Sequence, residues 1–359
     1  MKRTAIVALL LVAGCDRKET AHDSCCSAPA PAVQRSITRA DGILLTGLPD
    51  SPELAACDTH GRWGVKTPAI AHWIVDPTEK APLLPEENHP IVGLFRDSLP
   101  FPQTNWKAGD WEVTQLLFPV GKGFVVRYHV MNHGEDAHAA QLNVGTRENA
   151  GADSPLIATA DKPAATTLKF DLKIEPGVSQ FIHVTTPDLA GKFSEDALDQ
   201  ATAAWEKLLG SRALLLPDPA ACAAYYNNLA GQILGVAGCA EAAVKTEQML
   251  AKKEGNGLRL LSGIPEGWQL EAIEARDLPT DFGPLSFKYQ GAYNNRRFEF
   301  KPGCKPPDGF VIDVPEKLVA RVDGKDAPIM VVGFGDKAPN VRHLSVPAGA
   351  VIVELSYPR

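Results

Sequence analysis

The sequence predicts a mainly β protein in which two antiparallel β-sandwich domains are joined by a short helical segment. Apolar and polar residues alternate with period two in many short segments bounded by turn residues, in both halves of the chain. Helical periodicity is confined to residues 194–257, so the first half offers no crossover helix with which to build a parallel sheet.

The composition suits two packed domains and narrows the range of partners. Of 359 residues, 45% are hydrophobic, which is ample for two cores. The formal net charge is −7, and no basic charge run offsets it. Because phosphate binding needs a cationic surface, we expect no nucleic-acid partner. The motifs of serine hydrolases, zinc proteases, phosphate-binding loops and redox cysteine pairs are absent, so the sequence points to no catalytic residue and no cofactor.

Residues 1–14 are typical of a bacterial lipoprotein signal peptide. An apolar run from Ala5 to Val12 follows two basic residues, and it is too short for a transmembrane helix, which needs about 20 apolar residues. The sequence Val12-Ala13-Gly14-Cys15 resembles the lipobox, in which the signal is removed and the cysteine is lipidated. We therefore expect Cys15 to anchor the protein in a bacterial cell envelope. Asp16 favours the periplasmic face of the inner membrane over the outer membrane.

Residues 15–36 predict a flexible, lipidated tether, because they are polar and rich in alanine and proline. Export to an oxidising compartment allows the cysteines other than Cys15 to form disulfides. These are Cys25, Cys26, Cys57, Cys222, Cys239 and Cys304. Their pairing is not readable from the sequence. Cys222 and Cys239 flank two successive predicted helices and are our candidates for a local disulfide.

Residues 37–190 predict the N-terminal β-sandwich. Residues 168–174 alternate apolar and charged side chains, as expected of a strand with one buried face. Glu175-Pro176-Gly177 has the residues of a type II turn, so we expect an antiparallel hairpin with residues 178–185. A second hairpin is expected upstream, with its turn at residues 120–123.

Tryptophans concentrate in this domain, and exposed indole rings stack well on sugars. Trp106 and Trp111 lie in the segment 103–111, which reads as a polar loop, and they are our candidates for a carbohydrate-binding surface. The alternative is burial, because an aromatic side chain in a core removes about 150 to 250 Å² from water. Trp73 lies in the apolar segment 69–75 and is expected in the core.

His129 and His133 project to one side of a predicted strand, with His138 in the following loop. Residues four apart on a strand are separated by about 13 Å, which is too far for two ligands of one metal ion. We therefore interpret the histidines as a solvated strand face and expect no metal.

Residues 194–257 predict a linker of three helices. Ser194 is a suitable N-cap for the first helix, and Gly210 a suitable end. Asp218-Pro219 supplies the cap and first residue of the second helix. The third helix is expected at about residues 240–252.

Residues 258–359 predict the smaller C-terminal β-sandwich. Phe310, Ile312 and Val314 alternate with more polar residues, as in a half-buried strand. Val322-Asp323-Gly324-Lys325 contains the Asp-Gly pair of a type I′ hairpin.

Three segments resemble parts of the six-hairpin glycoside hydrolases, whose catalytic domain is an (α/α)6 barrel. Leu258 to Trp268 and Leu278 to Phe287 resemble the junction between the last barrel helix and the closing β-sandwich, and Trp205 to Asp218 resembles the linker helix and the first residues of the barrel. In that family an N-terminal β-supersandwich precedes the linker helix, the barrel and the closing β-domain. The resemblance implies a supersandwich-like fold for residues 37–190 and descent from a glycosidase.

The barrel itself is missing from this order. A barrel of twelve helices requires on the order of 250 residues, whereas about 64 lie between the two β regions. The family's catalytic carboxylates stand on barrel loops, so no catalytic residue can be carried over. We expect a lipid-anchored, non-catalytic protein that binds polysaccharide or cell-envelope material. A glycoside hydrolase with a rebuilt active site and a protein-binding envelope scaffold are the alternatives.

Overall fold

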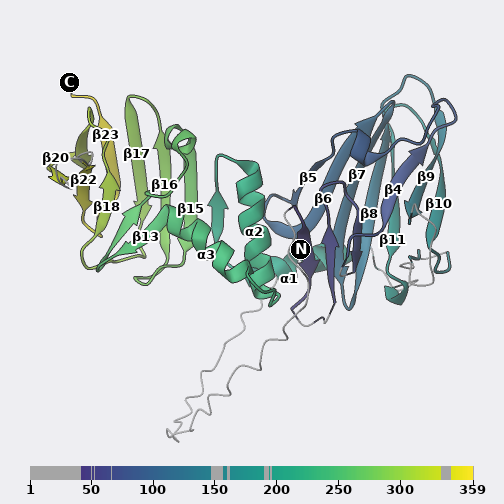
Figure 1. Cartoon of the computed structure of the whole chain (residues 1–359), viewed down its shortest axis with the longest axis horizontal. Helices are drawn as coiled ribbons and strands as arrows, with labels where there is room; N and C mark the ends of the chain where they lie inside the picture. The colour runs from purple at the N-terminus through teal and green to yellow at the C-terminus, as the bar shows by residue number, and fades with distance from the viewer. Residues whose placement is uncertain are drawn as a thin grey trace, which may run out of the picture. The chain divides into compact units, whose positions relative to one another are not determined.

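The computed structural model describes residues 42–49, 51, 53–65, 67–146, 157–159, 162–189, 194, 196–332 and 341–358. The predicted signal peptide and tether, with Cys15, Cys25 and Cys26, lie outside the described residues. The described chain is mainly β, as predicted, and its strands pair antiparallel except for one parallel pair, β14 with β18 (Figure 1). The mainly β, antiparallel class read from the sequence is therefore confirmed.

The strands of the N-terminal region form three antiparallel sheets, in the orders β11-β8-β7-β6-β5, β10-β9-β4 and β1-β2-β3. Buried residues from all three sheets form one hydrophobic cluster that includes Cys57, Trp106, Tyr128 and Leu142. The strands are β1 (Leu44–Gly47), β2 (Leu54–Cys57), β3 (Trp63–Val65), β4 (Ala71–Val75), β5 (Ile91–Phe95), β6 (Leu99–Ala108), β7 (Trp111–Val120), β8 (Gly123–Asn132), β9 (His138–Gly145), β10 (Thr167–Ile174) and β11 (Ser179–Thr185).

One of the two hairpins predicted here is confirmed and the other is wrong. β7 and β8 pair through a tight turn in which Val120 lies opposite Gly123. β10 and β11 follow one another through the predicted turn, where Gly177 has φ 70°. They do not pair, because β10 pairs with β9 and β11 with β8. The turn chemistry fixes the chain reversal, but the partner of each strand is decided by which sheet buries its apolar face.

Three α-helices follow in the described chain, namely α1 (Ala197–Leu209), α2 (Pro219–Ile233) and α3 (Cys239–Leu250). Asp218 caps α2 as predicted, since its carboxylate accepts a hydrogen bond from the N–H of Ala220 at 2.9 Å. The start of α1 was misplaced, because Ser194 Oγ donates to Asp196 Oδ1 at 2.6 Å and Asp196 takes the N-cap position. The predicted end of the third helix was also wrong, since the chain from Ala251 to Glu254 forms strand β13.

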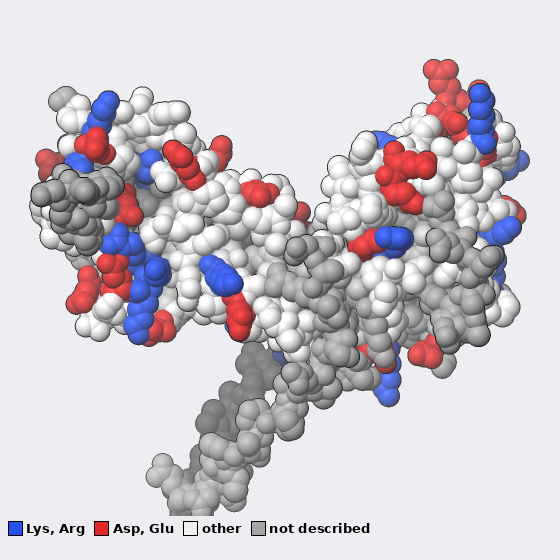
Figure 2. All heavy atoms as spheres, in the orientation of Figure 1, with Lys and Arg blue, Asp and Glu red and all other residues white. Residues whose placement is uncertain are grey.

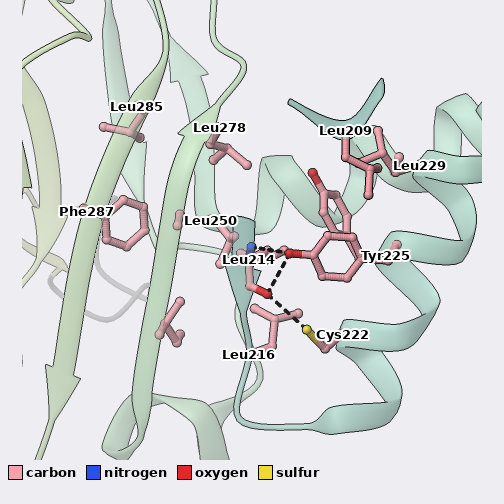
Figure 3. Packing of buried hydrophobic residues seen from close by; sticks show 14 of the residues in the cluster. Leu209, Leu214, Leu216, Cys222, Tyr225, Leu229, Leu250, Leu278, Leu285 and Phe287 are labelled. Carbon is pink, nitrogen blue, oxygen red and sulfur yellow. Dashed lines mark hydrogen bonds between the residues drawn. The ribbon is translucent and has the colours of Figure 1, made fainter. Parts of the chain in front are cut away.

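The helical segment is fixed to strands by side-chain hydrogen bonds. Asn227 on α2 accepts from the N–H of Leu45 at 2.8 Å and donates to the carbonyl of Ile43 at 2.9 Å. The Trp205 indole on α1 donates to the carbonyl of Gly47 at 3.0 Å. At the start of α2, the Cys222 thiol donates to the carbonyl of Leu214 at 3.1 Å (Figure 3).

The predicted disulfide between Cys222 and Cys239 is wrong, because the structure has no bond between these two buried residues. Cys239 packs on Gly231 of α2, where an added Cβ would lie 2.4 Å from its sulfur. Gly231 is nine residues beyond Cys222, which is about 13 Å along a helix, whereas disulfides need Cα atoms closer than about 7 Å.

The C-terminal region holds a seven-stranded sheet, β12-β15-β16-β17-β23-β19-β20, and a five-stranded sheet, β13-β14-β18-β22-β21. The rings of Phe300 on β17 and Phe310 on β18 stack at 5.0 Å and so join the two sheets in one core. The strands are β12 (Ala213–Leu215), β13 (Ala251–Glu254), β14 (Gly257–Leu260), β15 (Ala272–Leu278), β16 (Leu285–Gly291), β17 (Asn295–Lys301), β18 (Phe310–Asp313), β19 (Val319–Val322), β20 (Lys325–Ala327), β21 (Ile329–Val332), β22 (Val341–Val346) and β23 (Ile352–Ser356).

The type I′ hairpin predicted in this region is confirmed. Val322 lies opposite Lys325 across the turn. Asp323 and Gly324 have φ 49° and 78°, the positive values that this turn requires at both central residues.

Candidate functional site

The structure does not place Trp106 and Trp111 on a sugar-binding surface. Their side chains are 2% and 1% exposed, and the presumed polar loop is a strand pair in which Ala108 lies opposite Trp111. The Trp106 indole donates to His72 Nε2 at 2.8 Å, and the Trp111 indole donates to Asp76 Oδ2 at 2.7 Å. Since both ring faces are packed in the core, the prediction of an exposed stacking surface is wrong for these residues.

His72 is the inward-facing residue of the neighbouring strand β4, where the sequence suggested Trp73 instead. Trp73 is only half-buried, while His72 is fully enclosed. Burial lowers the pKa of His72 to about 3, so the ring is neutral and can accept the indole hydrogen. These tryptophans and their partners therefore form a polar network inside the core of the N-terminal region.

His129 on β8 and His133, just beyond the end of that strand, have separate partners. The His129 ring stacks on Phe181 with 4.7 Å between centroids, and His133 Nε2 lies 2.6 Å from Glu112 Oε2. Hydrogen bonds from Lys107 and Asn105 are the main reasons why the pKa of Glu112 falls to about 2. Nowhere in the described ranges do three or more His, Cys, Asp or Glu side chains gather as a metal site would need.

A pocket of about 380 Å³ lies in the C-terminal region, lined by strands of both sheets. Its apolar wall consists of buried side chains from five of these strands and is formed by Leu260, Tyr289, Phe298, Ile312 and Leu355. Polar side chains complete the lining, namely Ser262, Gln269, Arg296, Asp313, Glu316 and Arg342. An apolar wall with a few convergent polar groups is the usual composition of a small-molecule site.

Arg296 is the polar group that distinguishes this pocket. Its side chain shares the inner face of β17 with Phe298 and Phe300, because side chains two residues apart in a strand point the same way. One terminal nitrogen donates to Gln269 Oε1 at 3.2 Å. The Nε atom is buried and has no hydrogen-bond partner, so one N–H of this half-buried side chain, which lines the pocket, is unsatisfied.

Gln269 and Tyr289 support Arg296 from the wall. Gln269 belongs to a short 3₁₀ helix, Glu266–Leu270, and its backbone carbonyl accepts from the Tyr289 hydroxyl at 2.5 Å. Burial raises the pKa of Tyr289, and the nearby Arg296 guanidinium opposes that rise. The Tyr289 hydroxyl is therefore protonated and donates a hydrogen bond. This bond fixes the backbone of Gln269, whose side-chain oxygen accepts from Arg296.

A second depression, of about 240 Å³, shares Arg296, Pro315 and Glu316 with the first pocket. It is also lined by Tyr293 and Tyr357, whose side chains are 81% and 44% exposed. Two aromatic rings at the surface thus stand next to the polar groups of the pocket. Exposed aromatic rings of this kind were expected, on the sequence, at Trp106 and Trp111.

The other guanidinium of the pocket is already satisfied by the backbone. Arg342 donates to the carbonyls of Pro315 and Leu318 at 2.7 and 3.0 Å, and also to the carbonyl of Glu316. It therefore holds the wall segment between β18 and β19 in place.

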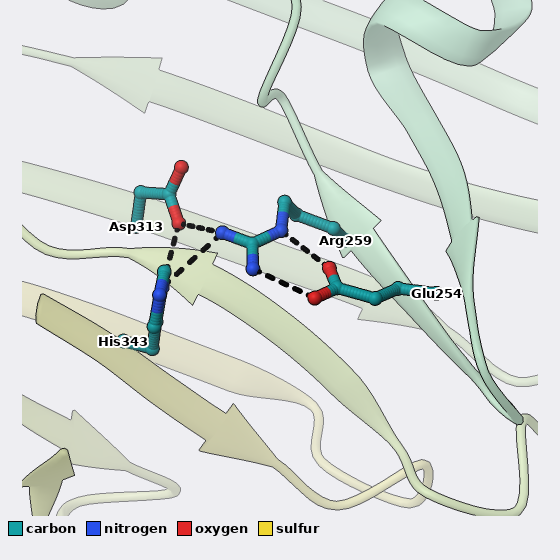
Figure 4. Close-up of polar contacts among 4 residues, drawn as sticks. All are labelled: Glu254, Arg259, Asp313 and His343. Atoms are coloured by element: carbon teal, nitrogen blue, oxygen red, sulfur yellow. Dashed lines mark hydrogen bonds and ion pairs between the residues drawn. The ribbon is translucent and has the colours of Figure 1, made fainter. Parts of the chain in front are cut away.

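Asp313 is likewise engaged, in a network on the five-stranded sheet (Figure 4). Its Oδ1 accepts from Arg259 at 2.7 Å and lies 2.9 Å from His343 Nδ1. Arg259 also donates two hydrogen bonds to Glu254, at 2.5 and 2.9 Å, and these lower the pKa of that carboxyl group. Arg259 is thus paired with two carboxylates and Arg342 with backbone carbonyls, which leaves Arg296 as the cation of the pocket that has neither among the described residues.

The sequence did not single out Arg296, Gln269 or Tyr293. One signal was present, because the alternating pattern Arg296, Phe298, Phe300 puts a charged residue at an inward position of a strand. Gln269 and Tyr293 carry no comparable signal, since their position at the pocket depends on how distant segments pack.

No protein-family model matches this chain, and no curated protein matches it. A solved structure named a polysaccharide lyase is similar at 10% sequence identity and a TM-score of 0.20. The match covers 89% of this chain and 47% of the other, so this chain spans about half the length of that protein. A likeness at that TM-score carries no argument about activity. The resemblance to six-hairpin glycoside hydrolases stays a prediction.

Proposed function

We propose that the protein is an exported, lipid-anchored module that binds a saccharide in the C-terminal pocket and acts by binding. The observation that supports this is the combination of an apolar-walled pocket of about 380 Å³ with two exposed tyrosines beside its polar lining. A sugar ring presents C–H groups that pack on an aromatic face and hydroxyls that need hydrogen-bond partners. Tyr293 and Tyr357 supply the first, and Gln269, Arg296 and Glu316 supply the second.

The test is a glycan array probed with the full-length protein in detergent, followed by titration of the best glycan. Tyr293→Ala removes an 81% exposed ring and is expected to weaken binding by about 3- to 10-fold, the effect of losing one aromatic contact. Tyr293→Phe keeps the ring and should bind within about 2-fold of the wild type. Phe181→Ala removes an exposed ring from β11 and serves as the matched control. Saturable binding that Tyr293→Ala leaves unchanged would refute the site, and absence of binding to any polysaccharide would refute the function.

The alternative, a glycoside hydrolase, requires catalytic carboxyl groups in the same pocket. Glycoside hydrolysis needs two carboxyl groups about 5 to 9.5 Å apart, and the acids in the lining are Asp313 and Glu316. Asp313 is already bonded to Arg259 and His343, which suits a structural acceptor. Turnover of a chromogenic glycoside that is abolished by both Asp313→Asn and Glu316→Gln, in folded variants, would favour the enzyme over the binding module.

The lipid anchor rests on the Val12-Ala13-Gly14-Cys15 motif alone. In the described part of the chain, no helix is both long enough and apolar enough to span a bilayer. Labelling cells with a clickable fatty acid should modify the wild type and not Cys15→Ala, which should appear in the soluble periplasmic fraction. Cys25→Ala changes a neighbouring cysteine of the tether and should remain membrane-bound.

A further inference from the structure

We propose that the saccharide bound in this pocket is acidic, and that its carboxylate pairs with the guanidinium of Arg296. This inference rests on the proposed function and names the class of ligand. Its starting point is a buried nitrogen: the Nε atom of Arg296 has no hydrogen-bond partner. A buried donor on a charged group costs free energy when it has no acceptor, and a bound ligand can reduce this cost by supplying one.

The charges around Arg296 leave the guanidinium uncompensated. Within 4.0 Å, none of the acidic side chains in the described ranges forms an ion pair with it. Asp313, in the same pocket, is paired with Arg259 at 2.7 Å. Glu316 is exposed at the rim, where water screens its charge.

The neighbouring residue in the sequence shows what a compensated arginine looks like in this sheet. Arg297 points to the opposite face of β17 and lies 2.9 Å from Glu299 and 2.6 Å from Glu354. Arg297 thus has two carboxylates of its own chain, whereas Arg296 has one neutral amide. Because Arg296 lacks the carboxylates that Arg297 has, we infer that its guanidinium binds an anion from outside the chain.

The geometry of the group favours a carboxylate. A guanidinium presents its N–H donors in a planar fork that matches the two oxygens of a carboxylate. Arg296 uses one terminal nitrogen for Gln269 Oε1, and its other terminal nitrogen, which is not among the buried atoms and has no partner in the described chain, can donate to an anion in the pocket. Gln269 also fixes the orientation of the fork, so the pocket is prepared for the anion before it binds.

Selection of an acidic ligand must come from the pocket and not from the charge of the whole protein surface. On the face shown in Figure 2, acidic and basic side chains are interspersed, and neither sign forms a continuous patch. The net charge of the chain is −7, so a polyanion is not attracted by the protein as a whole. An acidic sugar would therefore be selected by the pocket itself.

The experiment compares three glycans of equal length on the full-length protein in detergent: an oligogalacturonate, its fully methyl-esterified form and a sulfated oligogalactan. Esterification removes the charge and keeps the sugar, so this comparison needs no protein variant. We expect the free acid to bind at least about 10-fold more tightly than the ester, as for loss of one charged hydrogen bond. Tighter binding of the sulfated glycan would overturn the assignment to a carboxylate.

The variants Arg296→Gln and Arg297→Gln remove the same charge from adjacent positions. Arg296→Gln should lose the preference for the free acid over the ester, while Arg297→Gln should retain it. If Tyr293→Ala weakens binding but acid and ester bind equally, the carboxylate inference fails and saccharide binding stands. If none of the glycans binds, both proposals fail.

Discussion

The tryptophan network in the N-terminal core and the pocket in the C-terminal region both place polar groups among aromatic rings. They differ in whether these groups have hydrogen-bond partners within the protein. In the first, the indoles of Trp106 and Trp111 donate to His72 and Asp76 within the same core. In the second, Arg296 Nε finds no acceptor. The comparison teaches that indole donors can be satisfied wholly inside a core, whereas the charged side chain beside the C-terminal rings lines a cavity and keeps an unsatisfied donor.

The N-terminal core also contains unpaired atoms, and these help to define the contrast. His72 Nδ1 and both polar side-chain atoms of Gln115 are without partners. Neither side chain carries a charge, and His72 and Gln115 are 1% and 0% exposed. No ligand can reach them without opening the sheets, whereas Arg296 lines a pocket.

The largest effect is expected from truncating a buried ring. Trp106→Ala should lower the free energy of unfolding by about 3 to 5 kcal/mol, because it leaves a cavity and removes the hydrogen bond to His72. Tyr293→Ala should change it by less than about 0.5 kcal/mol, since that ring is 81% exposed. Urea unfolding of the wild type and both variants measures these changes in the free energy of unfolding. Equal losses in the two would break the distinction between a structural and a binding aromatic set.

A smaller effect is expected from the protonation of His72. Its folded-state pKa of about 3 lies below the usual 6.5, so between these values the unfolded chain binds a proton that the folded chain does not. Stability is therefore lost as the pH falls below 6.5, by about 2 kcal/mol between pH 7 and pH 5. His72→Gln should lose about 2 kcal/mol less than the wild type over this range in urea unfolding. The same pH slope in both proteins would show that His72 is protonated in the folded state.

The smallest effect concerns Arg296 itself and has the opposite sign. Replacing a half-buried cation that has no acidic partner by an apolar side chain of similar length is neutral or stabilising, so Arg296→Met should raise the free energy of unfolding by 0 to about 1 kcal/mol. The melting temperature would then stay level or rise by a few degrees. Arg297→Met is the control, and its loss of exposed ion pairs should cost less than about 1 kcal/mol. A marked destabilisation by Arg296→Met would mean that this arginine is structural.

Features set by local chemistry could be predicted from the sequence. The type I′ hairpin follows from Asp323-Gly324 because few residue pairs tolerate two positive φ angles. The cap at Asp218 follows from one carboxylate and the proline behind it. Such signals lie within a few residues of the structure that they specify.

Features set by packing between distant segments could not be predicted in this way. The turn at Gly177 was correct, but β10 and β11 lie in different sheets because each pairs with a strand far from the turn. The segment around Trp106 and Trp111 looks like a polar loop because its alternate residues face water. Only the partner strand shows that the indoles point inward. The pocket was missed for the same reason, since Arg296 and Gln269 are brought together by the fold.

Asn227 places an amide beside β1, the outermost strand of its sheet, and bonds to the N–H of Leu45 in that strand and to the carbonyl of Ile43 just before it. An outermost strand with open backbone groups is a template on which a second molecule can add a strand. By occupying backbone groups at this edge, the second helix blocks edge-to-edge pairing with another molecule at this point.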